Sequence, residues 1–490
     1  MVRTLVATAV ALTLLCTAAN AQDAKAIVSS TSKALGADGL NSISLSGSAS
    51  NVNFGQTKNI QGPYTLAPIT NYTRAIDLNA SATRQSGQTA PAQPGGQPGN
   101  FNQNITAAQT AWTQQLEIAL TPWGFLKGAA ANNATARTAK MNGKTYNVVS
   151  YSPSQKAPSG QAYTVTGYIN EQNEIERVET RVEHPILGDL LVENLYSTYQ
   201  PFGTLKVPTK ITQRRAGFNT FDATITSATA NPPNITELLT PPPAPGRAGG
   251  AGAPGAAAGG RAGGPPPPPA VETQKLGDGL FRITGGYVAI AADMGDHIVI
   301  LEGGQSEQRG LAIIDAAKKA IPGKPIRFVV NTHPHFDHGS GLAPFVAEGA
   351  TIITHENNEA FLEKALNSPR TLVGDTLAKA PKKAKIEGVG DKKTLKGGAN
   401  VIELYHVRGL EHSDGMLVAY IPKQKILLSA DFNFPPANAA PTPVPPAFVT
   451  LQQNVDRLKL DYDAFIPVHA PNPDRPLTKS DVQALMKGTN

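Results

Sequence analysis

The sequence predicts two folded domains of different class, a mostly antiparallel β (α+β) domain followed by an α/β domain of layered sheets and helices. Three observations predict this. Residues 22–240 are dominated by alternating apolar and polar residues, residues 241–270 contain only Pro, Gly, Ala and two arginines, and residues 271–490 interleave short apolar strands with helical segments. A length of 490 residues suits two or three domains of about 150 residues each.

The composition excludes several classes of protein. With 40% apolar and 16% charged residues, the chain is too hydrophobic to be disordered throughout. Its 43 Lys and Arg against 37 Asp and Glu give a net charge of +6 that is spread along the chain. The one lysine-rich stretch, Lys379 to Lys396, is expected to be a solvated face. Nucleic-acid binding is therefore not predicted.

The first 21 residues have the features of a secretory signal peptide. Arg3 precedes the apolar stretch Leu5 to Cys16, and Ala19-Asn20-Ala21 forms a small-residue cleavage site. The stretch is shorter than the roughly 18 to 20 apolar residues that span a bilayer, so we expect a periplasmic or secreted protein with no stable membrane span. Because Cys16 is the only cysteine, any metal site of the mature chain must use His, Asp or Glu.

The N-terminal domain, residues 22–240, is predicted to be an antiparallel sheet. Val178, Thr180 and Val182 alternate with polar residues, and Asn142-Gly143 and the stretch 170–173 are hairpin-turn signals. A helical piece is expected at Trp112 to Ala130.

Two low-complexity stretches are expected to be irregular. The Gln, Gly, Pro and Asn residues of 86–104 predict a long loop inside the N-terminal domain. Residues 241–270 cannot offset their ordering entropy by apolar burial, which predicts a disordered linker between domains that move independently.

The C-terminal domain, residues 271–490, is predicted to alternate strands and helices. Helices are expected at Ser306 to Ala320, where Leu311, Ile314 and Ala317 form an apolar stripe, and at Asn357 to Ala365. Strands are expected at Val288 to Ala291, Ile298 to Leu301, Ile326 to Val330, Thr351 to Thr354, Val401 to Tyr405, Leu417 to Ile421 and Lys425 to Ser429.

The stretch NTHPHFDHG, residues 331–339, directly follows the apolar strand IRFVV. It brings three histidines and an aspartate within six residues to the end of a buried strand, which is costly unless a partner binds them. A divalent metal is the simplest partner. His333 and His335 can reach one ion from the same side of the strand, whereas Asp337 and His338 lie past the turn and can point to a second ion.

The string H-x-H-x-D-H resembles the signature of the metallo-β-lactamase superfamily, and the resemblance extends over about residues 271–490. It implies an αββα sandwich with a di-zinc site. By the same resemblance, His412 in GLEHSDG is similar to the third ligand of the first zinc. Asp431 in LLSADF is similar to the carboxylate that bridges both ions, and His469 in IPVHAP is similar to the last ligand of the second.

These residues divide into two sets of metal ligands. The first ion is expected to bind His333, His335 and His412, and the second Asp337, His338 and His469, with Asp431 shared; Asp337 is also the candidate catalytic residue. Each ion could keep an open position, which is typical of catalytic sites. A water between two divalent ions would be a hydroxide near neutral pH, able to attack the carbonyl of a small-molecule ester, thioester, lactone or β-lactam.

Other residues near the motifs receive weaker assignments. Asn331 and Asp414 are candidates to orient a metal-bound imidazole, and His406 is expected to pack in the fold. His355 could line the mouth of the site, but a surface or core histidine is the favoured interpretation. Many members of the superfamily carry an Asp in an early turn where this chain has Glu302. Substrate-holding cationic residues of the lactamase or glyoxalase II subgroups are not recognisable.

Two alternatives stay open. The same ligands can hold iron, as in sulfur dioxygenases or redox members of the superfamily. The last strands of the N-terminal domain, which include GTLKVPTKITQRR, resemble the half-barrel of periplasmic lipoprotein-carrier proteins. This domain could instead hold a hydrophobic ligand, with the metal site as an accessory. The sequence does not specify the substrate or the oligomeric state.

Overall fold

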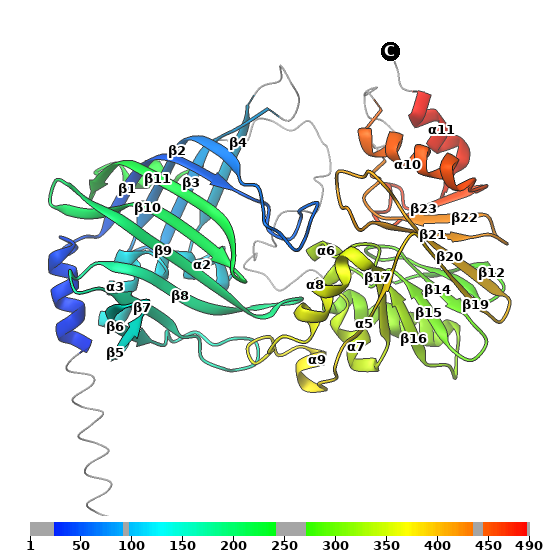
Figure 1. Ribbon diagram of the computed structural model, residues 1–490, viewed down its shortest axis with the longest axis horizontal. Helices are drawn as coiled ribbons and strands as arrows, with labels where there is room; N and C mark the ends of the chain where they lie inside the picture. Colours follow the sequence, from blue (N-terminus) through cyan, green and yellow to red (C-terminus); the bar gives the residue numbers. More distant parts are fainter. Residues whose placement is uncertain (1–23, 92–97, 242–270, 435–443, 488–490) are drawn as a thin grey trace, which may run out of the picture. The chain divides into compact units, whose positions relative to one another are not determined.

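The computed structural model describes residues 24–91, 98–241, 271–434 and 444–487, which form two compact units (Figure 1). The predicted signal peptide, residues 1–21, and the predicted linker beyond residue 241 lie outside the described residues. Each unit is described by itself.

Unit 1 is built on one 11-stranded sheet with the order β4-β3-β2-β1-β11-β10-β9-β8-β7-β6-β5. Neighbouring strands run antiparallel, as in the pairs β1–β2, β1–β11 and β10–β11, so the predicted sheet is confirmed. The strands are β1 (Ser42–Asn51), β2 (Ala67–Asp77), β3 (Ala82–Thr89), β4 (Gly99–Ile105), β5 (Thr135–Met141), β6 (Lys144–Tyr151), β7 (Val165–Ile169), β8 (Ile175–His184), β9 (Gly188–Phe202), β10 (Leu205–Arg215) and β11 (Phe218–Ala230).

Helices cover part of this sheet. The predicted helical piece is present as two helices, α2 (Trp112–Ala119) and α3 (Pro122–Ala131). The break between them lies at Thr121, whose side chain accepts a hydrogen bond from the Gly124 amide and begins the second helix. A further helix spans residues 24–34, and the short α4 (Ile235–Leu239) follows β11.

The turn predictions in unit 1 have mixed outcomes. Asn142 and Gly143, with φ of 50° and 78°, connect β5 to β6, and residues 170–173 connect β7 to β8, so both hairpins are confirmed. The predicted loop at residues 86–104 is wrong for residues 86–89 and 99–104, which pair as parts of β3 and β4 from Thr83↔Ile105 to Thr89↔Gly99, whereas residues 92–97 lie outside the described residues. Backbone hydrogen bonds hold this pair, and the polar side chains suit an edge strand in contact with solvent.

Unit 2 contains two further sheets, of seven and six strands. The first has the order β12 (Thr273–Gly277), β13 (Leu280–Ile283), β14 (Ala289–Asp293), β15 (Ile298–Leu301), β16 (Ile326–Val330), β17 (Thr351–His355) and β18 (Lys385–Val389). The second has the order β19 (Lys392–Gly397), β20 (Asn400–His406), β21 (Leu417–Ile421), β22 (Ile426–Ser429), β23 (Ala464–Pro467) and β24 (Leu477–Thr478). All seven strands predicted for this region are confirmed to within two residues.

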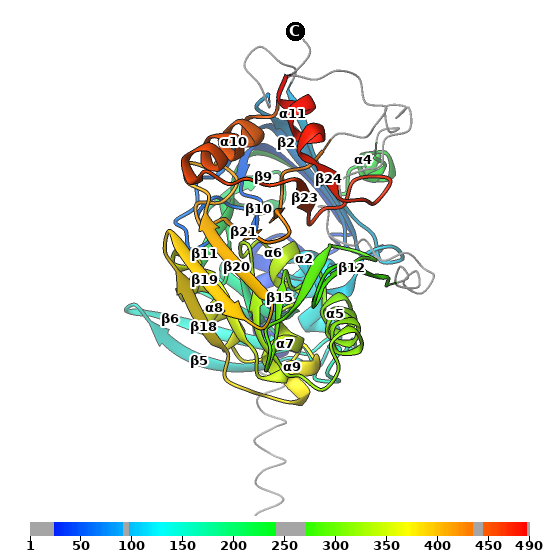
Figure 2. The same ribbon diagram turned by 90° about the vertical axis from the view of Figure 1, so that its right-hand side faces the viewer.

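The two sheets are sandwiched between helices, as predicted (Figures 1 and 2). Along β15, Val299 and Leu301 join a core cluster with residues of the second sheet, whereas Ile298 and Ile300 join a cluster with the helices. This alternation follows from the two-residue period of a strand and makes both faces of the sheet apolar. The covering helices on the first sheet are α5 (Glu307–Ala320), α7 (Ala343–Glu348), α8 (Glu356–Leu366) and α9 (Thr376–Lys379); those on the second are α10 (Pro446–Leu458) and α11 (Lys479–Lys487).

Helix α5 is confirmed, but one residue of its predicted apolar stripe is wrong. Ile314 and Ala317 are buried as expected, whereas Leu311 is 43% exposed. The buried face is instead continued by Ile313 and by Gly310, where a Cβ would come within 2.3 Å of the Gly341 carbonyl oxygen. The close approach of the backbone at Gly310 therefore sets which face of the helix points inward.

Unit 2 also includes two short segments from the first half of the chain. Asn53–Pro63, which connects β1 to β2, and His184–Gly188, which connects β8 to β9, belong to it. Ile60 and Ile186 from these segments are 3% and 0% exposed in its core. The compact units thus differ from the contiguous ranges 22–240 and 271–490 that the sequence indicated.

Arg309 is expected to be important for the stability of unit 2. Its buried guanidinium donates hydrogen bonds to the carbonyl oxygens of Ile283, Thr284 and Tyr287. Arg309→Ala would leave these oxygens without their charged donor and should lower the free energy of unfolding by about 3 kcal/mol, measured by urea denaturation.

The matched control is Lys318→Ala on the same helix. Lys318 forms an exposed ion pair with Glu348, so its loss should cost less than about 1 kcal/mol. Equal losses in the two variants would contradict the role assigned to Arg309.

Candidate metal centre

The seven predicted ligands lie at the ends of strands in unit 2. His333 and His335 follow β16, and Asp337 and His338 lie on the short helix α6 (Phe336–Gly339) directly after them. The remaining three follow strands of the second sheet or lie between them: His412 between β20 and β21, Asp431 after β22, and His469 after β23. Side chains from both sheets therefore meet at one edge of the sandwich, although they are far apart in the sequence.

The structure brings these side chains together in two groups. His333, His335 and His412 form one, and Asp337, His338, Asp431 and His469 form the other; within each group the possible ligand atoms lie within 4.8 Å of one another. The Nε2 atoms of His333 and His412 are 3.3 Å apart, and those of His338 and His469 are 3.0 Å apart. The other six residues divide between the groups as the sequence indicated, and Asp431, which was expected to be shared, falls in the second group.

Asp431 lies between the two groups. Its Oδ2 atom is 3.2 Å from His333 Nε2 and 3.0 Å from His338 Nε2, and its Oδ1 atom is 3.2 Å from His469 Nε2. The backbone at Asp431 is left-handed, with φ of 59°, a conformation that residues other than glycine rarely adopt. The carboxylate is thus held in a strained turn where it touches ligands of both groups.

The electrostatics of the cluster favour neutral imidazoles in the first group. Burial is the main cause that lowers the pKa of His333 well below its usual value, and burial lowers the pKa of His335 to about 4. Both rings therefore carry a free nitrogen lone pair at neutral pH, which is the form that binds a metal.

The second group is dominated by carboxylates. Burial opposes the charge of Asp431, but the His338 and His333 rings outweigh burial and hold the pKa of Asp431 well below its usual value. Burial also opposes the charge of His338, yet Asp431 and Glu302 raise its pKa well above the usual value. A positive charge is therefore stabilised at this position.

These residues fit a divalent metal. Five imidazoles and two carboxylates point at common points, and nitrogen and carboxylate oxygen are the donors that zinc and iron accept. Among the residues that the structure describes, the buried Nδ1 atom of His335 has no hydrogen-bond partner. A bound cation would give that nitrogen a partner and offset the cost of burying the cluster.

Comparisons with known proteins identify the family of one part of the chain. Residues 288–469 match the family model described as the metallo-beta-lactamase superfamily. Residues 288–469 are a metallo-beta-lactamase domain. The region from β14 to His469 therefore has the metallo-beta-lactamase fold that the sequence motifs implied.

Solved metallo-beta-lactamases are among the structures similar to this chain. The enzyme from Pontibacter korlensis is 17% identical, with a TM-score of 0.33 and coverage of 44% of this chain and 99% of that chain. The enzyme from Hirschia baltica is 19% identical, with a TM-score of 0.33 and coverage of 44% and 96%.

One curated relative also matches. It is the 2,4-dinitroanisole O-demethylase subunit alpha of Nocardioides sp. (strain JS1661), 25% identical over 199 residues, which are 39% of this chain and 53% of the relative. The chain thus spans about half the length of this relative.

The turn of the metallo-beta-lactamase domain that carries Glu302 supports the ligands from behind. Glu302 is fully buried with φ of 75°. Its Oε2 atom accepts a hydrogen bond of 2.6 Å from the Thr332 hydroxyl and lies 3.5 Å from His338 Nδ1. The longer side chain at this position therefore still reaches a candidate ligand.

The other residues that the sequence analysis singled out have contacts that differ from those of the seven candidate ligands. Asn331 is buried and donates from Nδ2 to the His338 carbonyl oxygen, so it contacts the backbone of a ligand and not its ring. Asp414 contributes its carbonyl oxygen to His406 Nε2. The rings of His355 and His406 stack with centroids 3.9 Å apart, which agrees with their predicted packing role.

Sequence reasoning missed three residues of the site, Tyr287, Gln56 and Thr57. The Tyr287 hydroxyl donates to Asp337 Oδ2 at 2.8 Å, and its ring centroid lies 4.2 Å from that of His469. Burial, followed by the charge of Asp337, raises the pKa of Tyr287 far above its usual value, so it keeps its proton. A tyrosine just before an apolar strand carries no motif, and residues 56 and 57 lie in the other half of the sequence.

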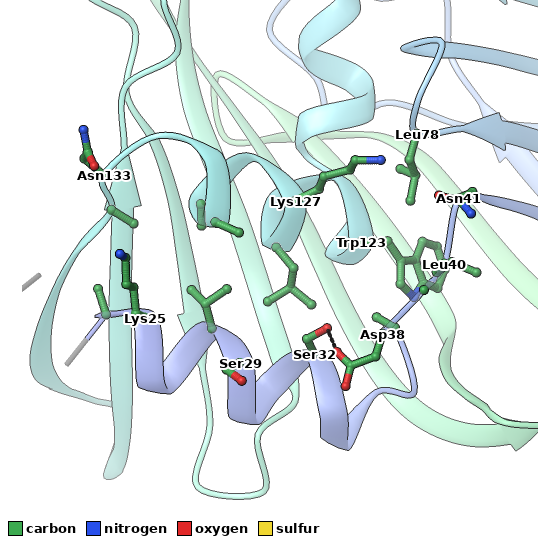
Figure 3. A pocket seen from close by; sticks show the side chains of 18 residues that line it. Lys25, Ser29, Ser32, Asp38, Leu40, Asn41, Leu78, Trp123, Lys127 and Asn133 are labelled. Atoms are coloured by element: carbon green, nitrogen blue, oxygen red, sulfur yellow. Dashed lines mark hydrogen bonds between the residues drawn. The ribbon is translucent and has the colours of Figure 1, made fainter. Parts of the chain in front are cut away.

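Unit 1 contains a separate pocket of about 660 Å³ (Figure 3). Helix 24–34 and α3 contribute apolar side chains, including Val28, Trp123 and Leu126, and Leu40 and Leu78 come from adjacent loops. Lys25, Ser29, Asp38 and Lys127 place polar groups around them.

Within the described ranges no helix combines the length and apolar character needed to cross a membrane.

The metal content of Asp431→Ala should test the role of the shared carboxylate. The wild-type chain is expected to retain two divalent ions after dialysis, measured by elemental analysis. Because Asp431 touches ligands of both groups, Asp431→Ala should retain about one ion.

Asp315→Ala is the control, since Asp315 is exposed and pairs with Lys319 on α5. It should retain both ions. Equal metal content in the wild type and in Asp431→Ala would refute the assignment of Asp431.

Proposed function

We propose that this protein is an exported metal-dependent hydrolase that uses two zinc ions to cleave a small-molecule ester, thioester, lactone or β-lactam. The observation that carries the proposal is the meeting of two ligand groups at Asp431, at the edge of a metallo-beta-lactamase domain. The ligands of the first ion are His333, His335 and His412. Those of the second are Asp337, His338 and His469, with Asp431 shared.

Divalent ions bound here would supply Lewis acidity and lower the pKa of water, which is the chemistry that hydrolysis of an activated carbonyl requires. The surroundings of the ligands set their protonation states. His333 and His335 stay neutral because they are buried, and Asp431 stays ionised because imidazoles surround it.

Asp337 is the proposed catalytic carboxylate. Burial opposes its charge, but His338 and the hydrogen bonds from Gln56 and Tyr287 together lower its pKa below the usual value. Asp337 therefore accepts hydrogen bonds on both oxygens, from Gln56 at Oδ1 and from Tyr287 at Oδ2. An ionised carboxylate in this position can orient and accept a proton from a polarised water.

A second candidate function follows from the name of the curated relative, an O-demethylase subunit. Aryl methyl ethers therefore join the substrate classes to be tested. The alternative metal is iron, which would support sulfur-oxidising or redox chemistry, because imidazoles with carboxylates suit both zinc and iron. Elemental analysis of protein purified without added metal distinguishes zinc from iron.

His335→Ala should abolish turnover of whichever substrate the wild type accepts. The purified chain is assayed against a panel of β-lactams, lactones, esters, thioesters, phosphodiesters and aryl methyl ethers. Loss of His335 removes a buried donor of the first group, so kcat/KM should fall at least about a hundredfold.

The control for this assay is His297→Ala. Among the described residues, His297 pairs with Asp296 and packs against the Phe328 ring, so the variant should turn over substrate like the wild type. Full activity of His335→Ala would refute the assignment of that ligand.

The pocket of unit 1 favours a binding role for the N-terminal half, and we propose an apolar ligand for it. Its apolar lining around Trp123 supports this occupant. Export is proposed from residues 1–21, which lie outside the described part of the chain.

The two tryptophans of the chain allow a direct test of the pocket. Trp123 lines the pocket and Trp112 does not. In Trp112→Phe, where Trp123 is the only reporter, a fatty-acid probe should change the tryptophan emission saturably. In Trp123→Phe the same probe should leave the emission unchanged, and equal responses in both variants would contradict binding at this pocket.

A further inference from the structure

The segment Asn53–Pro63, called here the 53–63 segment, lies against the loop that carries four of the candidate ligands. It belongs to unit 2, although it connects two strands of unit 1. It lies more than 200 residues before the range 288–469 that matches the family model.

Three consecutive residues of the segment contact the ligand loop. The Phe336 amide donates to the Gly55 carbonyl oxygen at 3.1 Å. Gln56 Nε2 donates to Asp337 Oδ1 at 2.6 Å, and His335 Nε2 lies 3.1 Å from the Thr57 carbonyl oxygen. Two candidate ligands, one from each group, therefore have a hydrogen-bond partner in this segment.

The segment is held in place by its own contacts. Gly55 has φ of 89°, and a Cβ there would come within 2.1 Å of the Phe336 ring, so only glycine fits. The rings of Phe54 and Phe336 meet edge to face at 5.2 Å, and Ile60 is 3% exposed in the core.

Further along, the segment reaches the loop that carries His412. The Asp414 amide donates to the Lys58 carbonyl oxygen, and Lys58 Nζ pairs with Glu411 at 2.7 Å. Gln61 Nε2 donates to the Asn357 carbonyl oxygen. The segment is therefore attached on both sides of the residues that face Asp337 and His335.

We propose that Gln56 and the Thr57 carbonyl are positioning groups of the metal centre, so that a segment outside the metallo-beta-lactamase domain completes it. This inference rests on the proposed function. The Thr57 carbonyl oxygen accepts a hydrogen bond from His335 Nε2, so the proton of the neutral ring lies on Nε2 and the lone pair lies on Nδ1. Nδ1 is buried and has no hydrogen-bond partner among the described residues, so it is free to bind a metal. Gln56 fixes the orientation of the Asp337 carboxylate from the side opposite Tyr287.

The expected size of the effect follows from the role of outer hydrogen bonds at metal sites. Removing a partner of a metal ligand commonly lowers metal affinity about 10- to 100-fold. Because Gln56 contacts Asp337 of the second group, its loss should weaken the second ion more than the first.

The experiment is a titration of the metal-free full-length chain with Co²⁺, followed by visible absorption. Wild type should take up two ions. Gln56→Ala should bind the second Co²⁺ at least tenfold more weakly, with an altered absorption band for that ion. Gln56→Glu keeps the size of the side chain but loses the donor and faces Asp337 with a like charge, so it should weaken the second ion at least as much.

Gln61→Ala is the matched control, because it removes a glutamine of the same segment whose side chain donates to the Asn357 carbonyl oxygen and not to a candidate ligand. It should bind both ions like the wild type. If Gln56→Ala and Gln56→Glu bind the second ion as tightly as Gln61→Ala does, the inference is overturned. The proposed function is still supported in that case, provided that the wild type binds two ions and hydrolyses substrate. If the wild type binds no Co²⁺, both are overturned.

Discussion

The structure of unit 2 depends on the burial of a polar cluster at the edge of two apolar sheets. Five imidazoles and two carboxylates meet where the strands end, and three of the rings are almost fully buried. Such a cluster is stable only if opposite charges, hydrogen bonds or a cation compensate for lost water. Asp431 shows the compensation best, since it lies within about 3 Å of rings from both groups.

The compensation extends outward through hydrogen bonds. Glu302 accepts a hydrogen bond from Thr332 and lies close to His338, and Tyr287 donates a hydrogen bond to Asp337. Arg309 in turn binds the Tyr287 carbonyl oxygen, so a buried arginine on α5 is connected to the cluster through the backbone. The sandwich thus holds the candidate ligands through neighbours that are themselves fixed by hydrogen bonds, as a precise metal centre would require.

Segments from the first half of the chain take part in the same network. Gln56 and Thr57 reach Asp337 and His335, and Ile60 and Ile186 are buried in the core of unit 2. A fragment that begins at residue 271 would lack all of these contacts. The boundaries of the two compact units therefore do not coincide with the division of the sequence at its low-complexity stretch.

The sequence by itself determined the class of both units and seven of the strands of unit 2, because hydrophobic periodicity is a local signal. It also indicated the seven residues that the structure brings together, four of them through the histidine-rich motif and three, His412, Asp431 and His469, through the resemblance to the metallo-β-lactamase superfamily. The tertiary structure alone decided the rest. Leu311 faces outward because a close backbone approach at Gly310 sets the face of α5, and residues 86–89 and 99–104 lie in strands because backbone pairing does not require apolar side chains. Tyr287, Gln56 and Thr57 reach the cluster through long-range folding, and no spacing along the chain encodes contacts across 50 residues, as for Tyr287, or across more than 200, as for Gln56 and Thr57.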